Sequence, residues 1–104
     1  SEEKEIEEYK KRFETPAGWV DLSQFAEELR THAKDAKVVA VCVNEEQVAV
    51  ARCPNCGYYV HTMNDDVVAV LKRIKFGGVT DFVCDCPWNF IVIKTKIGYI
   101  VLHR

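Results

Sequence analysis

The sequence predicts an α+β protein held together by a metal site. Short valine-rich runs bounded by turn residues are typical of strands, and apolar residues every three or four positions are typical of helices. Four of the five cysteines stand in two close pairs, Cys53 with Cys56 and Cys84 with Cys86. We expect two N-terminal helices and then an antiparallel sheet of short hairpins with one inserted helix, stapled by these cysteines. The chain is long enough for a single domain, residues 1–104.

The composition is that of an ordinary globular chain, with 48% apolar and 29% charged residues. No apolar run reaches the roughly 18 residues of a membrane-spanning helix, and the acidic start is the opposite of a secretory signal. We therefore expect a cytoplasmic protein with no membrane partner. Because the cysteine count is odd and the thiols are clustered, metal binding or redox chemistry is favoured over a disulfide framework.

Charge is unevenly distributed along the chain. Residues 1–36 hold ten acids and six bases, a net of −4, whereas residues 37–104 hold six acids and eight bases, a net of +2. Four thiolates around a divalent ion would contribute about −2 and cancel that surplus. The chain is not strongly basic, so charge alone does not predict a nucleic-acid-binding protein.

Two helices are expected before the sheet. The first covers residues 2–13 and has a narrow apolar stripe. Residues 1–14 could dock on the domain as a solvated helix or act as a semi-independent arm that becomes ordered on a partner. The second helix is expected to start at Asp21, an N-cap with Gln24 in the third helical position, and to end near residue 35.

The next part of the chain is predicted to be a hairpin. Residues 37–43 form a continuous apolar run that is too short for a buried helix and rich in valine, so we expect a central strand. Residues 44–46 would turn the chain, and residues 47–52 would return as the second strand. Cys42 lies in the first run, and we interpret it as a small buried hydrophobic residue.

The remaining elements follow the first cysteine pair. Residues 58–63 are predicted to form a strand. A helix then starts at Asp65 and Asp66, carries one apolar face and stops at a pair of glycines. The two acids therefore belong to a helix start and not to a catalytic carboxylate pair. Further strands are expected over residues 79–83, 89–94 and 99–103.

The first cysteine pair belongs to the sequence Cys53-Pro54-Asn55-Cys56-Gly57. Two cysteines three residues apart place both sulfurs inside a tight turn. Proline stiffens the turn, and glycine permits the positive φ that follows the second cysteine. Backbone N–H groups in such a loop can point at the sulfurs and offset their charge.

The second pair is unusual because its spacing is Cys-x-Cys. In an extended segment, residues two apart project to the same side, so Cys84 and Cys86 can both face one ion. His61 is a weaker candidate to replace one thiolate. His32 and His103 have no partner at ligand spacing.

Four thiolates in a tetrahedral array suit zinc or iron. Zinc is the default for a structural site, which is closed and leaves no position for a substrate. Iron would make an electron carrier instead. Two alternatives stay open, a redox-active Cys-x-x-Cys pair and uncoordinated thiols.

The first loop resembles the metal-binding knuckle of zinc ribbons and rubredoxins. Cys53, Cys56 and Gly57, followed by Tyr58, match that knuckle, and residues 81–84 are similar to the approach to the second knuckle of a rubredoxin. The resemblance implies a ribbon-like or rubredoxin-like metal fold with four cysteine ligands. It is local, because the second pair is Cys-x-Cys with no glycine after it, and the intervening stretch is predicted to be strand and helix.

Three functions are compatible with such a site. The first is a non-enzymatic zinc module that binds nucleic acid or a macromolecular assembly, as a transcription- or translation-associated regulator. The second is a protein–protein adaptor with structural zinc, and the third is a rubredoxin-like iron electron carrier. No triad or phosphate-binding loop predicts an enzyme. A surface that binds nucleic acid would use basic side chains interleaved with aromatic ones. The candidate basic residues are Arg52, Lys72, Arg73, Lys75, Lys94 and Lys96.

Overall fold

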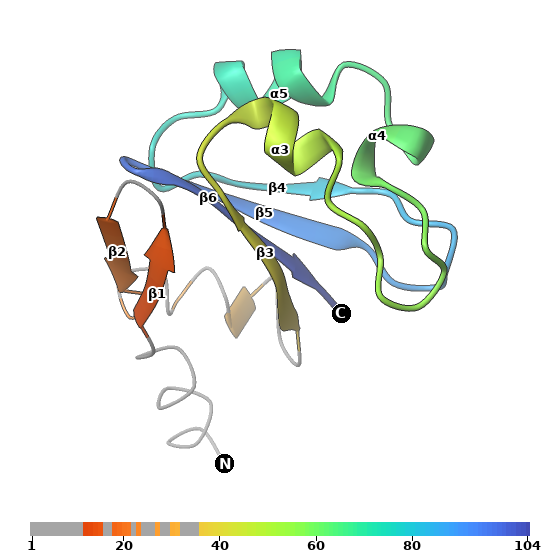
Figure 1. Cartoon of the computed structure of the whole chain (residues 1–104), viewed down its shortest axis with the longest axis horizontal. Coiled ribbons are helices and arrows are strands. Elements are labelled where there is room, and N and C mark those ends of the chain that lie inside the picture. Colours follow the sequence, from red (N-terminus) through yellow and green to blue (C-terminus); the bar gives the residue numbers. More distant parts are fainter. Residues whose placement is uncertain (1–11, 16–17, 22, 24–26, 28–29, 32–35) are drawn as a thin grey trace.

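The computed structural model of the chain describes residues 12–15, 18–21, 23, 27, 30–31 and 36–104. A four-stranded antiparallel sheet dominates this part, with the order β3-β6-β5-β4. Its strands are β3 (Lys37–Cys42), β4 (Val79–Phe82), β5 (Phe90–Thr95) and β6 (Gly98–His103). Short helices cover one face (Figure 1), namely α3 (Glu45–Ala49), α4 (Val60–Met63) and α5 (Val67–Arg73). The expected α+β class is confirmed. No helix in the described residues is long and apolar enough to span a membrane.

The two inner strands, β5 and β6, are apolar on both faces. Val92 and Val101 are opposite each other and pack with Leu71 of α5 on the helix side of the sheet. Ile93 and Ile100 form the next pair and belong to a second buried cluster on the other face. Neighbouring residues of a strand project to opposite faces, so two buried faces require a continuous apolar run. The strands predicted over residues 79–83, 89–94 and 99–103 are confirmed as β4, β5 and β6.

The strand predicted at residues 37–43 is present as β3, but it is an edge strand and not the predicted central one. Among the described strands of this sheet, β3 pairs only with β6. Most of its side chains are half-buried, and Cys42 at its end is buried, as predicted. A continuous apolar sequence predicts that both faces of a strand are covered. It does not predict whether the strand is central or at the edge of the sheet.

The predicted return strand at residues 47–52 is wrong, because α3 occupies this position. Asn44 is the N-cap residue, and its Oδ1 accepts a hydrogen bond from the Gln47 N–H at 2.9 Å. The Gln47 side chain in turn accepts from the Val43 N–H at 2.8 Å. Glu45 and Glu46 lie in the first turn, where the helix dipole favours negative charge.

The predicted strand at residues 58–63 is also wrong, because only Tyr59 pairs, in an isolated bridge, and residues 60–63 are helical. Around the cysteine loop the chain pairs with itself only briefly, through a bridge between Arg52 and Tyr59 and a hydrogen bond of 2.9 Å from the Val60 N–H to the Ala51 carbonyl. The single turn α4 then begins at Val60, whose side chain is fully buried. The Val60 side chain can be buried as well by a helix that packs on the sheet as by a strand.

The predicted third helix is confirmed as α5, but it ends at Arg73 and not at the glycine pair, Gly77 and Gly78. Val67 and Leu71 are its buried residues, and Asp66 is its N-cap residue, although the Asp66 side chain makes no capping hydrogen bond. Lys72 and Arg73 lie in the last turn, where they interact favourably with the dipole.

The N-terminal prediction is only partly covered by the structure. Most of the predicted helix over residues 2–13 lies outside the described residues. Its end is wrong, because Arg12–Thr15 form β1, which pairs antiparallel with β2 (Gly18–Asp21). For the second helix, the described residues Glu27, Arg30 and Thr31 are helical, and the Asp21 carboxylate accepts a hydrogen bond from the Ser23 N–H. The rest of that helix lies outside the described residues.

Candidate metal centre

The first cysteine pair lies in a tight loop, as predicted. The Gly57 N–H donates to the Cys53 carbonyl at 3.0 Å, and Gly57 has a φ of 78°. The backbone N–H groups of Asn55 and Cys56 point at Cys53 Sγ, at 3.4 and 3.5 Å. The predicted N–H···S contacts are thus present at Cys53.

The second pair is positioned by Asn64, which follows α4. The Asn64 amide group donates to the carbonyls of Val60 and Val83, both at 2.8 Å, and its Oδ1 accepts from the Val83 N–H at 3.0 Å. Asn64 therefore pairs with the backbone of Val83 as a neighbouring strand would. This contact fixes the residue directly before Cys84 against the helix layer.

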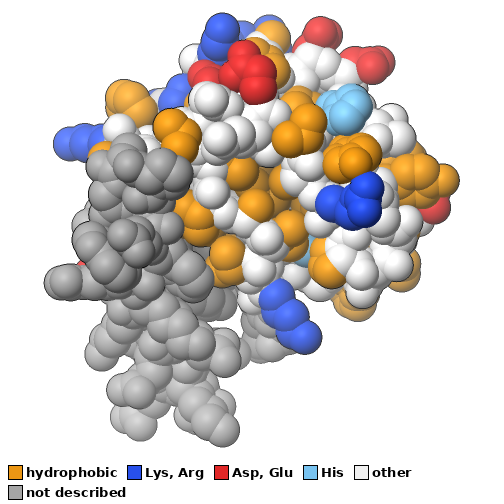
Figure 2. Space-filling model, viewed as in Figure 1, with side chains coloured by type: hydrophobic (Ala, Val, Ile, Leu, Met, Phe, Trp, Pro, Cys, Tyr) orange, Lys and Arg blue, Asp and Glu red, His pale blue; other side chains and the backbone are white. Residues whose placement is uncertain are grey.

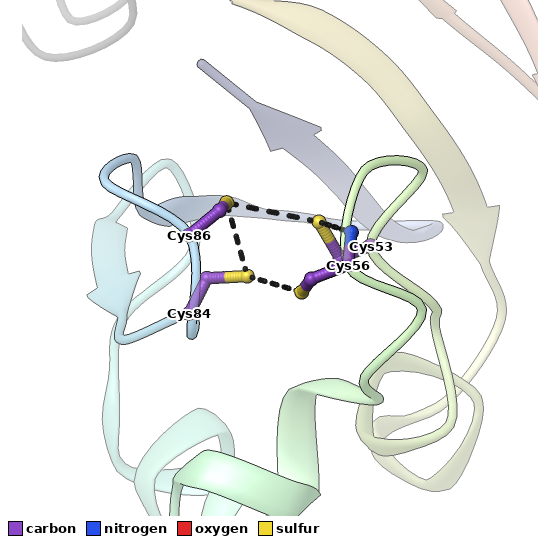
Figure 3. A group of neighbouring side chains, drawn as sticks. All are labelled: Cys53, Cys56, Cys84 and Cys86. Atoms are coloured by element: carbon purple, nitrogen blue, oxygen red, sulfur yellow. Dashed lines mark hydrogen bonds between the residues drawn. The ribbon is translucent and has the colours of Figure 1, made fainter.

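The four sulfurs converge on one point (Figure 3). Cys84 Sγ lies 3.4 Å from both Cys56 Sγ and Cys86 Sγ, and Cys53 Sγ lies 3.9 Å from Cys86 Sγ. All four lie within 4.8 Å of one another. With metal–sulfur bonds of about 2.3 Å, a regular tetrahedron has sulfurs about 3.8 Å apart. The group is therefore compatible with a metal knuckle, and it could hold a metal ion.

The cluster is largely shielded from solvent. Cys53 and Cys84 are buried, while Cys56 and Cys86 are half-buried, and none of the five cysteines forms a disulfide. Burial raises the pKa of the Cys84 thiol far above its usual range, and hydrogen bonds with the neighbouring sulfurs add to the rise. A metal ion that binds here must displace these protons, so metal binding is coupled to proton release.

His103 contacts the cluster, which the sequence did not reveal. Its Nε2 lies 3.4 Å from Cys53 Sγ and 3.2 Å from Cys86 Sγ, and its Nδ1 lies 2.6 Å from the Arg104 carbonyl oxygen. The side chain is 3% exposed. Strand pairing places His103 opposite Phe90, four residues after Cys86, so knowledge of the register would have been needed to find it.

The other histidine considered as a ligand is not at the site. His61 lies on α4, where its Nδ1 is 2.8 Å from the Ala49 carbonyl oxygen and its ring stacks on Tyr59. His32 lies outside the described residues.

The six basic residues that are candidates for contacting nucleic acid lie in two separate regions. Lys94 donates to the Leu71 carbonyl at the end of α5 and lies over the Phe76 ring, and Lys96 lines the same hollow as Phe76. Lys72, Arg73 and Lys75 belong to that end of α5 or follow it directly. Arg52 is separate, because it donates to the Tyr59 hydroxyl at 2.7 Å and lines a hollow beside the cysteine loop.

Comparison of the chain with protein-family models, with curated proteins and with solved structures finds no match in any of the three. Function is therefore inferred from the chemistry of the site and of the surface around it.

Proposed function

We propose that the protein is a non-enzymatic zinc module that binds nucleic acid in the cytoplasm, as part of a transcription or translation assembly. The zinc proposal is carried by the closed group of four sulfurs, which leaves no coordination position for a substrate. The ion would join the loop of Cys53 and Cys56 to the segment of Cys84 and Cys86. Zinc suits such a joint because it has no redox chemistry.

Elemental analysis together with a visible spectrum of the purified protein tests the metal. We expect one zinc per chain and no colour, even after growth in iron-rich medium. The variant Cys84→Ser should lose most of the zinc, and Cys42→Ser should keep it because Cys42 lies outside the sulfur group. A coloured, reversibly reducible protein would instead support the rubredoxin-like electron carrier, and a metal-free protein would contradict both.

Nucleic acid as the partner is supported by the surface at the end of α5. Phe76 is 61% exposed there, and the Lys94 ammonium lies 5.4 Å from the centre of its ring. With Lys96 they line a hollow of about 430 Å³. An exposed aromatic ring beside cations can stack on a base while the cations contact phosphates. We define the α5-end surface as Lys72, Arg73, Lys75, Phe76, Lys94 and Lys96.

The binding test uses fluorescence anisotropy with single-stranded and duplex DNA and RNA at several salt concentrations. The variant K72E/R73E/K75E should bind more weakly, and the slope of log affinity against log salt should become shallower by about 0.7 to 0.9 for each phosphate that the variant no longer neutralises. F76A should weaken binding to single strands without changing this slope. The control is K37E, whose charge change lies at the start of β3. No salt-sensitive binding to any probe, or an equal effect of K37E, would contradict the proposal.

A second candidate, a protein–protein adaptor, is favoured by a hollow of about 720 Å³ over the helix layer. Its apolar lining includes Val67, Val68 and Val50, and Val50 is 57% exposed. Acidic and basic side chains lie next to each other along this edge of the molecule (Figure 2). Such a mixed border around an apolar patch suits a protein segment better than a nucleic acid. Pull-down with V50E against wild type would separate this candidate, since Val50 is not part of the α5-end surface and only Lys72 borders both.

A further inference from the structure

We infer that His103 is a positioning residue of the metal centre, which donates a hydrogen bond from Nε2 to the sulfurs of Cys53 and Cys86 from outside the group of four ligands. This inference rests on the proposed metal site and deepens it, since it adds a fifth side chain to the centre.

The ring is held in place from three sides. His103 is the last residue of β6, an inner strand, and its backbone is opposite Phe90 on one side and Lys37 on the other. The Phe90 ring meets the imidazole edge-on, with the ring centres 5.0 Å apart. Because the His103 side chain is only 3% exposed, water cannot readily replace it as a hydrogen-bond partner of the sulfurs.

The hydrogen-bond chemistry assigns the direction of the contact. Nδ1 lies 2.6 Å from the Arg104 carbonyl oxygen, on the side of the ring away from the sulfurs. A metal-bound thiolate can only accept, so Nε2 donates to Cys86 Sγ at 3.2 Å and to Cys53 Sγ at 3.4 Å.

His103 lies outside the ligand set. Among the described residues, the donor atoms that all lie within 4.8 Å of one another at this site are the four sulfurs and do not include Nε2. The ring nitrogen instead contacts the edge of the tetrahedron between Cys53 and Cys86.

The location of the His103 contact indicates its role, which is to compensate charge on the sulfurs. Cys53 already accepts from the backbone of its glycine-containing turn. In the Cys-x-Cys segment the Cys86 backbone hydrogen-bonds to the Cys84 sulfur, and no glycine follows to bring further backbone N–H groups to Cys86 Sγ. A side-chain donor on a rigid strand supplies the compensation there. Hydrogen bonds to ligand atoms stabilise the charge on a thiolate and tune the metal.

The test compares H103L, which removes the donor, with H103Q, whose amide N–H can still reach the sulfurs. H61L is the matched control, because His61 is a histidine away from the cluster. Chelator competition with zinc should show an affinity loss of about 10- to 100-fold for H103L, most of it restored in H103Q and none of it present in H61L.

Cobalt(II) substitution provides a readout that a packing defect does not imitate. Removal of a hydrogen bond raises the electron density on sulfur, so the sulfur-to-cobalt charge-transfer bands of H103L should shift to lower energy. H103Q should keep the wild-type bands. Equal bands and equal affinities in H103L and wild type would overturn the inference while leaving the zinc site intact, whereas failure of wild type to bind any metal would overturn the zinc site as well.

If H103L does not fold, the wild-type protein loaded with ¹¹³Cd still decides the question. A donated N–H···S bond should give a scalar coupling between ¹¹³Cd and the Nε2 proton of His103, through Cys53 or Cys86 sulfur. A slowly exchanging Nε2 proton without such a coupling would overturn the assignment, and so would loss of that proton together with a one-bond coupling between ¹¹³Cd and Nε2 itself.

Discussion

Single side chains decide how the two halves of the cysteine cluster are placed. The first half is fixed by its own turn, because Gly57 allows the chain to fold back and backbone N–H groups meet Cys53 Sγ. The second half has no such turn, and Asn64 takes its place by pairing with the backbone of Val83. The order of the site therefore depends on a residue that is not itself a ligand.

Replacement of Asn64 tests this dependence. N64L removes one acceptor and the donor of two hydrogen bonds, so we expect a loss of about 1–3 kcal/mol in the free energy of unfolding and faster release of the metal. N64D keeps the oxygen that accepts from Val83 but places a carboxylate oxygen against the carbonyls of Val60 and Val83, so it should lose at least as much as N64L. Urea unfolding and transfer of zinc to a chelator provide the measurements. N89L is the control, because Asn89 is exposed and close in sequence to the same cysteines; an equal effect of N89L would contradict the role of Asn64.

Cys42 gives a prediction for alkaline pH. Burial raises the pKa of its thiol from 9.0 to about 11. The unfolded chain loses this proton near pH 9 and the folded chain keeps it until about pH 11, so the contribution is complete below pH 9 and is lost as the pH rises to 11. At pH 10 the loss should be about 1 kcal/mol.

The comparison of wild type with C42V isolates this effect, because the four clustered cysteines are common to both proteins. Urea unfolding at about pH 7.5 and about pH 10 should show a larger drop for wild type than for C42V. A drop of the same size in both proteins would mean that Cys42 ionises as freely in the folded protein as in the unfolded chain.

At the scale of the elements, two glycines permit two turns for different reasons. Gly57 has a φ of 78° and open space where a Cβ atom would lie, so G57A should cost about 1 kcal/mol through backbone conformation alone. At Gly98 a Cβ atom would collide with the Cys42 carbonyl group, so the β3–β6 contact would have to open. We expect G98A to cost more than G57A, about 1–3 kcal/mol from overpacking.

Thermal unfolding of both variants checks the order. G57N should recover stability relative to G57A, because asparagine tolerates a left-handed backbone, whereas G98N should be at least as damaging as G98A. If the two alanine variants were equally stable, the close approach at Gly98 would not be a constraint on the fold.

Some of the helices and strands could be predicted from the sequence and others could not. The strands of the C-terminal half followed from their apolar runs, and α5 followed from its periodic face. The short helices α3 and α4 were missed because valines such as Val48 and Val60 are typical of strands, yet here burial against the sheet outweighs that preference. The pair Asn44 and Gln47 was a helix-start signal that pattern reading could have used.

The candidate ligands could be predicted because each pair of cysteines is close together in the sequence. Both cysteine pairs were found in this way, and the structure brings all four sulfurs together. His103 and Asn64 were not found, because their roles come from strand register and from the packing of α4. Side chains that support a ligand can lie anywhere in the chain, so spacing rules do not reveal them.

For the whole molecule, the sheet and the cysteine cluster are two sources of order that meet on the helix side of the sheet, where Cys53 and Cys84 share a buried cluster with Val92 and Val101. The sheet has a buried cluster on each face. The cysteine cluster brings together two loops beyond the strands, at Cys53 and at Cys84, and an ion bound there would join them. This division predicts that the loops depend on the ion more than the sheet does.

Metal removal followed by hydrogen exchange tests this division. After chelation, the backbone amides at residues 53–57 and 84–88 should lose protection, because without the ion the buried thiols regain their protons and the sulfurs no longer hold the loops together. Amides of Ile93 and Ile100, in the inner strands, should exchange much more slowly, since both residues belong to the buried cluster that contains no cysteine. C84S should reproduce the pattern of the chelated protein without chelator, and C42V should resemble the loaded wild type. Uniform loss of protection over β5, β6 and both loops on chelation would show instead that metal binding and folding of the sheet form one cooperative step, as in small zinc fingers.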